Sequence, residues 1–571
     1  MSHRASGHAA VVAVLLVVTV LVTWPTVATI GTAIPGQPTS DAYDHLWGAW
    51  WYAHEIGNGE LPVRTEISHW PPGGLLWFID PLGALLSLPF QLVLSPAGAY
   101  SCVAMLQVLG GMLGAYALAW TKTGARVPAA LAGVIYGASP FVLSLLHSGT
   151  MEYLALAPLP LAWLAFERAL ASGSRRDVGL AAGAWASATL GNFYYAAFTG
   201  LLLLVAVWLA RGLGWRVVLE RAATVILVFA AVAAPILAVA GWTLTSPEAV
   251  VDAASAPGWN YEALPATDLT TFLRPGDHYF PDNRKTGNFG IIHVNYLGWV
   301  TFALALFGAW RQPRWRVPLA VAAVLALGPT LCVDGQLVFV AGRPLPLPAS
   351  LLYLPGSPFR FVHHPFRLVV LLMLFAGQAA AAGLAARPRV AAVAGGLVLA
   401  ETLLLSPAVF PLPTAPARAP AAIAALARDA TVDTIWDFPP NHHVANRRYE
   451  MLQTVHGKRV PYGVNAFLPE AWRDNHFVRA MMQCLKKPVL TAIPREGGRP
   501  LDAWLQKPVK SRVAEGREEL LEDGFDLVVL HLGSLAESER ACARRQIGGA
   551  ARHADDEVEL WPLAGETVAA P

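Results

Sequence analysis

Long apolar runs separated by short polar loops fill the first 414 residues of the chain. A membrane-spanning helix needs about 20 apolar residues, because the hydrocarbon core is ~30 Å thick and a helix rises about 1.5 Å per residue. Backbone polar groups must bond internally there, so runs of this length predict helices. Eleven such runs are present, at residues 9–30, 99–120, 127–146, 153–170, 178–195, 196–211, 221–241, 294–310, 317–333, 366–385 and 390–408.

One further apolar run, residues 80–95, is short and is broken by Pro81 and Pro89. It predicts a helix that lies at the membrane interface or dips in and out, rather than a twelfth span. A full span there would reverse the sidedness of every later loop.

The positions of Lys and Arg predict how the spans are oriented. With the N-terminus in the cytoplasm, 14 of the 21 basic residues of the first 414 fall in inside loops, and 14 of the 18 acids fall in outside loops. The long outside loops are then 31–79, 242–293 and 334–365. The odd number of spans places the C-terminal tail outside. A cleaved signal peptide is the alternative for the N-terminus, since Arg4 precedes an apolar run.

The charge pattern changes near residue 415. Residues 415–571 hold 41 of the 80 charged residues, which is the composition of a soluble domain. Strand-like runs at Thr434–Phe438 and Asp526–His531 alternate there with charged, helix-like stretches. The predicted fold is an all-α polytopic membrane domain over residues 1–410, a Pro/Ala-rich linker over 411–428, and an extracytoplasmic α/β domain over 429–571.

Composition excludes several classes of protein. The apolar fraction of 55% rules out a soluble enzyme and a single-pass receptor, and the net charge of +2 gives no sign of nucleic-acid binding. Four cysteines are too few for a disulfide scaffold. Cys484 and Cys542 can pair if the tail is outside the cytoplasm, whereas Cys102 and Cys332 are expected to be small buried side chains.

The first outside loop carries two acids, Asp41 and Asp44, just after the first span. The residues that follow have a helical pattern with tryptophans suited to the headgroup layer. A carboxylate held beside apolar walls loses solvation and gains basicity, so it can accept a proton from an acceptor hydroxyl. The alternative is that Asp41 caps the helix and Asp44 is solvated.

Three other groups of polar residues are candidates. Glu152 lies in a short outside turn, where a helix-start acid favoured by the helix dipole is the alternative interpretation. Asp277 and His278 can ligate a divalent cation, although ordinary turn chemistry explains them equally well. Glu401 lies inside the last apolar run, and an acid within a membrane span is costly and usually functional.

A cationic cluster precedes the tenth span, in the segment SPFRFVHHPFR. It suits a lipid-linked phosphate, because guanidinium groups bind phosphate through paired hydrogen bonds. Snorkelling to lipid headgroups is the alternative, but this is more typical of the cytoplasmic side. The cluster consists of Arg360, His363, His364 and Arg367.

The chain resembles the GT-C superfamily of integral-membrane glycosyltransferases, and more narrowly the bacterial YfhO-like and related proteins. The resemblance rests on one span followed by a long acidic outside loop, many short-looped spans and an outside tail. The stretches SDAYDHLW…WPPGG, SPFRFVHHPFR and YEMLQTVHGKRVPYGVNAF carry it locally. The chain lacks the adjacent acidic pair of protein mannosyltransferase-like members and a WWDYG-type tail motif.

The resemblance implies a polyprenyl-phosphate-linked sugar donor and a glycan, lipid or protein acceptor at the outer face of the inner (plasma) membrane. Asp44 best matches the first-loop acid, with Asp41 as the alternative, and Glu152 matches a second acid. Arg360 and Arg367 fall where a donor-phosphate contact is expected. A divalent cation, Mg²⁺ or Mn²⁺, is the cofactor that the resemblance leaves open.

Two other functions remain as alternatives to a glycosyltransferase. A transporter or lipid flippase would place ionisable residues at mid-membrane on several helices, whereas Glu401 is the one such residue in this threading. A non-catalytic assembly partner in cell-envelope polysaccharide synthesis would depend on the tail alone.

Overall fold

A computed structural model describes residues 2–210, 212–250, 266–276, 292–354, 357, 362, 364–439, 444–463, 475–486 and 512–564. Contacts divide the chain into two compact units. The membrane unit comprises Met1–Ala42, Ile79–Ala238 and Gly258–Ala415, and the tail unit comprises Tyr43–Phe78, Val239–Pro257 and Pro416–Pro571. The domain boundaries expected from the sequence stay predictions, but the first outside loop belongs largely to the tail unit.

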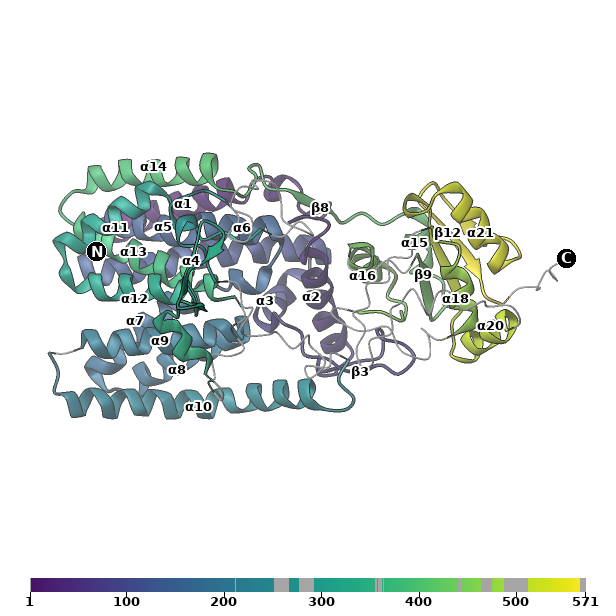
Figure 1. The fold of residues 1–571 in the computed structure, drawn as a ribbon, viewed down its shortest axis with the longest axis horizontal. Coiled ribbons are helices and arrows are strands. Elements are labelled where there is room, and N and C mark those ends of the chain that lie inside the picture. The colour runs from purple at the N-terminus through teal and green to yellow at the C-terminus, as the bar shows by residue number, and fades with distance from the viewer. Residues whose placement is uncertain are drawn as a thin grey trace. The chain divides into compact units, whose positions relative to one another are not determined.

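The membrane unit consists mainly of helices that run side by side (Figure 1). They are α1 (Ser2–Val22), α3 (Pro81–Gln91), α4 (Pro96–Thr123), α5 (Arg126–Gly137), α6 (Pro140–Ser148), α7 (Pro158–Ser172), α8 (Arg175–Gly191), α9 (Phe193–Leu209), α10 (Trp215–Thr245), α11 (Trp299–Arg311), α12 (Arg316–Ala326), α13 (Val369–Gly383) and α14 (Pro388–Leu405). Short 3₁₀ turns join them at η1 (Thr26–Ala28), η2 (Met151–Leu154), η4 (Leu269–Phe272), η6 (Pro313–Trp315), η7 (Pro348–Tyr353) and η8 (Pro365–Leu368).

Proline and glycine set many of these helix ends. The side chains of Ser95 and Ser139 accept a backbone N–H and are each followed by a proline at the first helical position. Gly124 and Gly173 end α4 and α7 with φ of 65° and 63°. Proline at the first position has no N–H to leave unpaired, and glycine adopts positive φ without steric cost.

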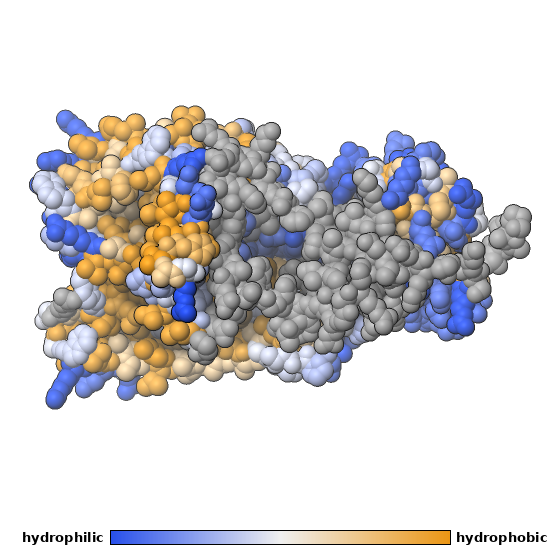
Figure 2. Space-filling view, in the orientation of Figure 1, coloured by the Kyte–Doolittle hydropathy of each residue, from blue (hydrophilic) through white to orange (hydrophobic). Residues whose placement is uncertain are grey.

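Among the described residues, five helical segments are long and apolar enough to cross a membrane: Pro96–Thr123, Met151–Ser172, Trp215–Thr245, Pro365–Gly383 and Pro388–Leu405. The bent pair α5 and α6, with an angle of 40° between its parts, makes a sixth if it is one span. The chain is therefore an integral membrane protein, and the face of the membrane unit seen in Figure 2 is largely apolar. The count of eleven spans and the sidedness stay predictions.

The helix α13 lies at the centre of the membrane unit. Its span is 83% buried, against 17% for α10 and 28% for α14. Small residues allow its close packing, since a Cβ on Gly377 would lie 2.9 Å from the carbonyl oxygen of Ala132 on α5. Close backbone approach through small residues is a common way to associate helices in lipid.

The membrane unit also contains short strands. The strand β1 (Ala33–Pro35) pairs with β8 (Thr414–Pro416). Two hairpins follow α12, namely β4 (Cys332–Val333) with β5 (Gln336–Leu337), and β6 (Phe339–Val340) with β7 (Arg343–Pro344).

The tail unit is built on a four-stranded sheet of order β11-β12-β10-β9. The strands β9 (Ile435–Phe438) and β10 (Leu527–His531) are parallel, while β12 (Val558–Pro562) runs antiparallel to β10 and to β11 (His553–Ala554). Both β9 and β10 are buried along their whole length, as expected of parallel strands covered on both faces.

Helices and the first outside loop complete the tail unit. The helices are α2 (Ala42–Gly57), α15 (Ala421–Leu426), α16 (Val444–His456), α18 (His476–Met482), α20 (Val513–Glu522) and α21 (Glu537–Ile547), with a turn η9 (Leu532–Ser534) and a small hairpin of β2 (Arg64–Thr65) and β3 (Gly74–Leu75). The side chains of α18, α20 and α21 pack with Trp436, Phe438 and Val528 of the sheet into one apolar core. A disulfide joins Cys484 to Cys542.

Candidate functional site

Arg367 belongs to the membrane unit and lies in η8, the turn just before α13. It stacks on Tyr153, with 3.5 Å from Cζ to the ring centroid, and also faces Tyr194 at 5.3 Å. Tyr153 comes from η2, and Tyr194 is the second residue of α9. The side chain of Asn192, which caps α9, accepts the Tyr194 N–H at 2.7 Å. Such stacking holds the planar fork of an arginine in a fixed orientation.

Two acids act electrostatically on Arg367. They are Glu152 and Asp41, and both belong to the membrane unit. Glu152 is buried, with 6% of its surface exposed, and Asp41 is half-buried. A buried guanidinium is costly without opposite charge nearby, so these acids compensate it. The structure thus brings together three residues predicted from the sequence, namely Asp41, Glu152 and Arg367.

Glycines place the first loop close to the turn that carries Glu152. Gly149 has φ of 66°, and a Cβ there would lie 2.8 Å from the Cα of Ala42. Gly36, with φ of 122°, is equally crowded, since its Cβ would lie 3.0 Å from the Cα of Gly149. Glycine is therefore required at both positions for this close backbone approach.

His147 fixes the same region and was not singled out from the sequence. Its carbonyl oxygen accepts the Gln37 N–H at 3.0 Å, and its Nε2 lies 3.3 Å from the Gln37 side-chain amide. Its Nδ1 accepts the Val409 N–H at 3.3 Å. A fully buried histidine thus ties α6 to the first loop and to the segment after α14. Its position directly before Ser148-Gly149 at a helix end was the only signal in the sequence.

Asp44, the predicted base, belongs to the tail unit. It lies in the first turn of α2, where a carboxylate is favoured by the helix dipole. Its Oδ1 is 3.7 Å from Nε of Arg447 on α16, and it is 6% exposed. An acceptor hydroxyl would have to compete with this guanidinium for the carboxylate. No pattern in the sequence indicates Arg447 as its partner.

The remaining predicted residues are only partly described. His364 lies in a ring cluster, 5.8 Å from His293 and 5.8 Å from Phe366 between centroids. Arg360, His363, Asp277 and His278 lie outside the described residues. Within the described ranges, no group of three or more His, Cys, Asp or Glu side chains is placed to hold a metal ion.

Glu401 makes contacts that give it a structural role, and a functional role for it stays a prediction. Its carboxylate accepts the Trp299 and Val300 N–H groups at 2.6 and 2.9 Å, and the Tyr296 hydroxyl at 2.7 Å. It therefore caps the N-terminus of α11 from a different helix. Gly298 allows the carboxylate of Glu401 to approach the backbone closely. Its φ is 83°, and a Cβ at this position would lie 3.0 Å from Glu401 Oε2.

Buried polar networks also fix the tail unit. Asp437 accepts from Tyr462 and lies 2.5 Å from Nε2 of His531, joining the ends of β9 and β10. Burial and the Asp437 charge raise the pKa of the Tyr462 hydroxyl well above its ordinary value. A large hydrogen-bonded network of this kind orders a core and leaves little freedom for chemistry.

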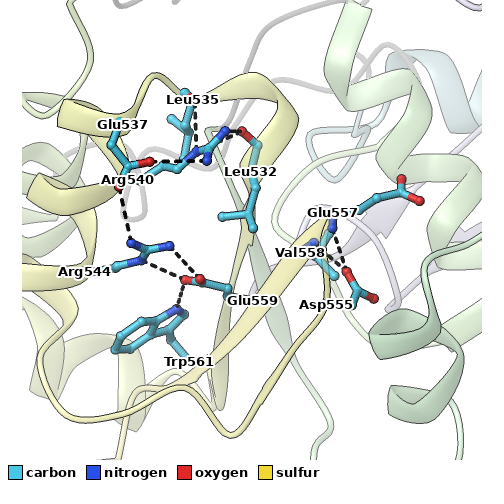
Figure 3. Close-up of polar contacts among 10 residues, drawn as sticks. All are labelled: Leu532, Leu535, Glu537, Arg540, Arg544, Asp555, Glu557, Val558, Glu559 and Trp561. Carbon is cyan, nitrogen blue, oxygen red and sulfur yellow. Dashed lines mark hydrogen bonds and ion pairs between the residues drawn. The ribbon is translucent and has the colours of Figure 1, made fainter.

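A second network joins α21 to β12 (Figure 3). Arg544 donates two hydrogen bonds to Glu559, at 3.0 and 2.7 Å, and Trp561 donates a third at 2.9 Å. Burial opposes ionisation of Glu559, but these hydrogen bonds outweigh it and lower its pKa. Arg540 caps the preceding turn through the carbonyl oxygens of Leu532 and Leu535.

Comparison with solved structures supports the fold. The arabinofuranosyltransferase AftD from Mycobacteria aligns over 97% of this chain at 17% identity, with a TM-score of 0.50. The archaeal oligosaccharyltransferase AglB from Archaeoglobus fulgidus, solved with an inhibitory peptide and a dolichol-phosphate, aligns over 95% of this chain and 72% of its own at 11% identity and a TM-score of 0.41. No protein-family model and no curated protein sequence matches the chain.

The chain shares the fold of AftD, which agrees with the predicted resemblance at the level of the fold alone. The chain spans about two-fifths of the length of AftD, since it covers 41% of that protein. The narrower resemblance to YfhO-like proteins stays a prediction.

Proposed function

We propose that the chain is a membrane glycosyltransferase that takes a sugar from a polyprenyl-phosphate-linked donor and transfers it to a glycan, lipid or protein acceptor on the extracytoplasmic side of the inner membrane. The observation that carries this proposal is the cluster of Asp41, Glu152 and Arg367, whose arginine directly precedes Leu368 in the lining of an apolar groove. The fold shared with AftD supports a membrane glycosyltransferase but does not identify its substrates.

The groove is lined entirely by apolar side chains of α9, α12 and the start of α13, and encloses about 190 Å³. Leu368, the residue after Arg367, is part of its lining. An isoprenoid chain seated there would gain about 0.8 kcal/mol per buried CH₂ relative to water, although lipid tails compete for much of that gain. The phosphate at the end of the isoprenoid would then lie near Arg367.

Each polar residue has a separate role in this proposal. Arg367 stabilises the negative charge that grows on the departing lipid phosphate. Asp41 or Asp44 accepts the proton of the acceptor hydroxyl, and Arg360, His363 and His364 add positive charge at the phosphate. Of the two acids, Asp41 is favoured as the base because it belongs to the same unit as Arg367 and interacts with it, whereas Asp44 belongs to the tail unit.

A divalent cation fits this cluster only in part. Asp41 and Glu152 supply carboxylate oxygens, which Mg²⁺ and Mn²⁺ prefer. Arg367 already interacts with both acids, so a cation would need further oxygens from the donor phosphate and water. When bound, the cation would neutralise charge on the phosphate. The proposed pair Asp277 and His278 stays a prediction.

The test is transfer of radiolabelled sugar from a panel of polyprenyl-phosphate donors by the purified chain in lipid nanodiscs. Asp41→Asn should lower kcat by about 100-fold or more as a general base is lost, and Arg367→Lys by about 100-fold. Glu248→Gln, at a salt bridge with Arg64 on the surface of the tail unit, is the control and should retain activity. Normal turnover in Asp41→Asn and in Arg367→Lys would refute the cluster as the active site.

The roles of the two first-loop acids are separated by a paired comparison. If Asp44 is the base, Asp44→Asn abolishes sugar transfer, whereas Arg447→Gln only lowers its rate. If Asp44 serves the ion pair alone, both variants lower thermal stability equally and leave kcat near normal. Tail-dependent function with Asp41, Asp44 and Arg367 all dispensable would instead support an assembly partner.

A further inference from the structure

Residues 330–346, which follow α12, form an antiparallel meander. Its two hairpins turn at Asp334-Gly335, with φ of 51° and 75°, and at Ala341-Gly342, with φ of 50° and 76°. Positive φ at both central residues defines the tight turn that best matches strand twist. The second hairpin, Phe339–Pro344, is called the apolar hairpin below.

Backbone hydrogen bonds continue between the hairpins. The N–H of Val338 donates to Leu331 at 2.9 Å, and the N–H of Leu345 donates to Val338 at 2.8 Å. Leu331 in turn donates to Leu345 at 3.0 Å. Paired backbone groups are the condition for placing non-helical chain against hydrocarbon, since lipid offers no hydrogen-bond partners.

The base of the meander is fixed to the rest of the membrane unit. Asp268, just before η4, accepts the Gly335 N–H, and forms a bridge with Cys332. Asp334 pairs with Arg274 at 3.0 Å. The first hairpin is therefore held by polar contacts, and the apolar hairpin extends from a rigid base.

The surface of this segment is apolar where a soluble loop would be polar. Its exposed large side chains are Leu337 (40%), Phe339 (59%), Val340 (57%), Leu351 (66%) and Leu354 (55%). Residues 329–354 contain only two charged side chains, Asp334 and Arg343. Contiguous exposed apolar surface of this kind marks a site of interaction with protein or membrane.

Continuity with the lipid-facing helices identifies the occupant. The turn η7, which carries Leu351, packs against α12. On that helix, which belongs to the membrane unit, Val317 and Val321 are each 47% exposed. The exposed apolar residues of the segment thus adjoin a helix of the membrane unit that exposes apolar side chains of its own.

We propose that the apolar hairpin, together with Leu351 and Leu354, is embedded in the outer leaflet of the bilayer. Phe339 and Val340 lie among the upper acyl chains. Arg343, directly after the turn, reaches the lipid phosphates with its guanidinium group while its stem stays in apolar surroundings. Residues 337–354 are then a membrane-anchored element and not a free extracytoplasmic loop.

The test is the depth of a spin label in lipid nanodiscs, measured by collision with oxygen and with a water-soluble nickel chelate. The background carries Cys102→Ala and Cys332→Ala and keeps the Cys484–Cys542 disulfide. The label is placed at Val340→Cys. Leu227→Cys, 70% exposed on α10, is the lipid reference, and Glu518→Cys, exposed on α20, is the water reference. Leu351→Cys replaces Val340→Cys if that variant does not fold.

At Val340, collisions with oxygen should outnumber collisions with the nickel chelate. The depth parameter, which is the logarithm of that ratio, should have the same sign as at Leu227 and the opposite sign from that at Glu518. A label that collides mainly with nickel would show that the hairpin lies in water and would overturn the proposal. A label shielded from both reagents would show burial against protein, which overturns it equally. The nanodisc supplies only lipid and the scaffold belt at its rim, so a signal like that of Leu227 reports contact of the hairpin with lipid.

Discussion

Arg367 shows what a single charged residue requires inside a membrane protein. From the sequence, it was one of four cations in a cluster suited to phosphate. In the structure it is stacked on Tyr153 and balanced by Glu152 and Asp41, which come from segments more than 200 residues away in the chain. The sequence identified the residue and its charge, but it had no means of pairing it with those partners.

Glu55 on α2 gives the first prediction at the residue scale. Burial raises its pKa to about 7, helped by the charges of Glu60 and Glu66, although a hydrogen bond from Trp51 opposes this. Because the folded pKa exceeds the ordinary value, the folded state is destabilised as pH rises from about 4.5 to 7, and the full penalty persists above that.

Glu55→Gln should therefore raise the Tm at pH 8 and leave it unchanged at pH 4. Thermal unfolding of the purified chain across this pH range measures the effect. The exposed acid Glu220→Gln is the control, with no pH-dependent change expected. An equal gain in Tm at both pH values would contradict the raised pKa of Glu55.

Glu401 provides a second prediction at this scale. Leu in its place would remove the acceptor of two backbone N–H groups and a tyrosine hydroxyl, at a cost of about 2–4 kcal/mol. Glu401→Leu should lower the Tm strongly, whereas Glu401→Gln keeps one acceptor oxygen and should lower it less. If Glu401 were functional instead, Glu401→Gln would lose activity while keeping a normal Tm.

At the scale of elements, helix positions were predictable and their partners were not. Proline and serine at the starts of α4 and α6, and glycine after α4 and α7, are local signals that any reader of the sequence can use. Asp41 and Asp44 are three residues apart, yet the former joins the membrane unit and the latter the tail unit. No periodic pattern encodes that division, because it depends on contacts made by distant segments.

The packing of α13 leads to a prediction at this scale. Gly377→Ala would place a Cβ 2.9 Å from the backbone oxygen of Ala132, where the helices have to move apart. Gly179→Ala on α8 is the matched control, because nothing lies within 4 Å of its Cβ and alanine favours a helix. The former should lower the Tm in detergent and the latter should not. Equal behaviour of the two variants would contradict close packing at Gly377.

At the scale of the whole molecule, composition alone separated membrane from tail residues, since the charge density rises beyond residue 415. The first outside loop did not follow that division, because most of it packs with the tail segment. The pairing of Cys484 with Cys542 was conditional on an oxidising compartment, and the structure places the two Cα atoms 5.5 Å apart in a disulfide.

Loss of that disulfide is the prediction at this scale. The bond closes a loop of 58 residues, so its removal by Cys542→Ser should cost about 3–4 kcal/mol of tail stability. Limited proteolysis of the purified chain should then cut the tail faster than the membrane helices. The double variant Cys484→Ser/Cys542→Ser controls for a free thiol and should behave in the same way as the single variant.

The disulfide also constrains where the protein can mature. A ribosome releases Cys484 well before Cys542, so the bond cannot close until both have passed to a side of the membrane that keeps thiols oxidised. Cells deprived of their thiol-oxidising machinery would then accumulate chain whose helices are inserted but whose tail is exposed to quality-control proteases. Yield in such cells, compared with that of the double serine variant, would report the compartment that the tail occupies without any assay of transfer.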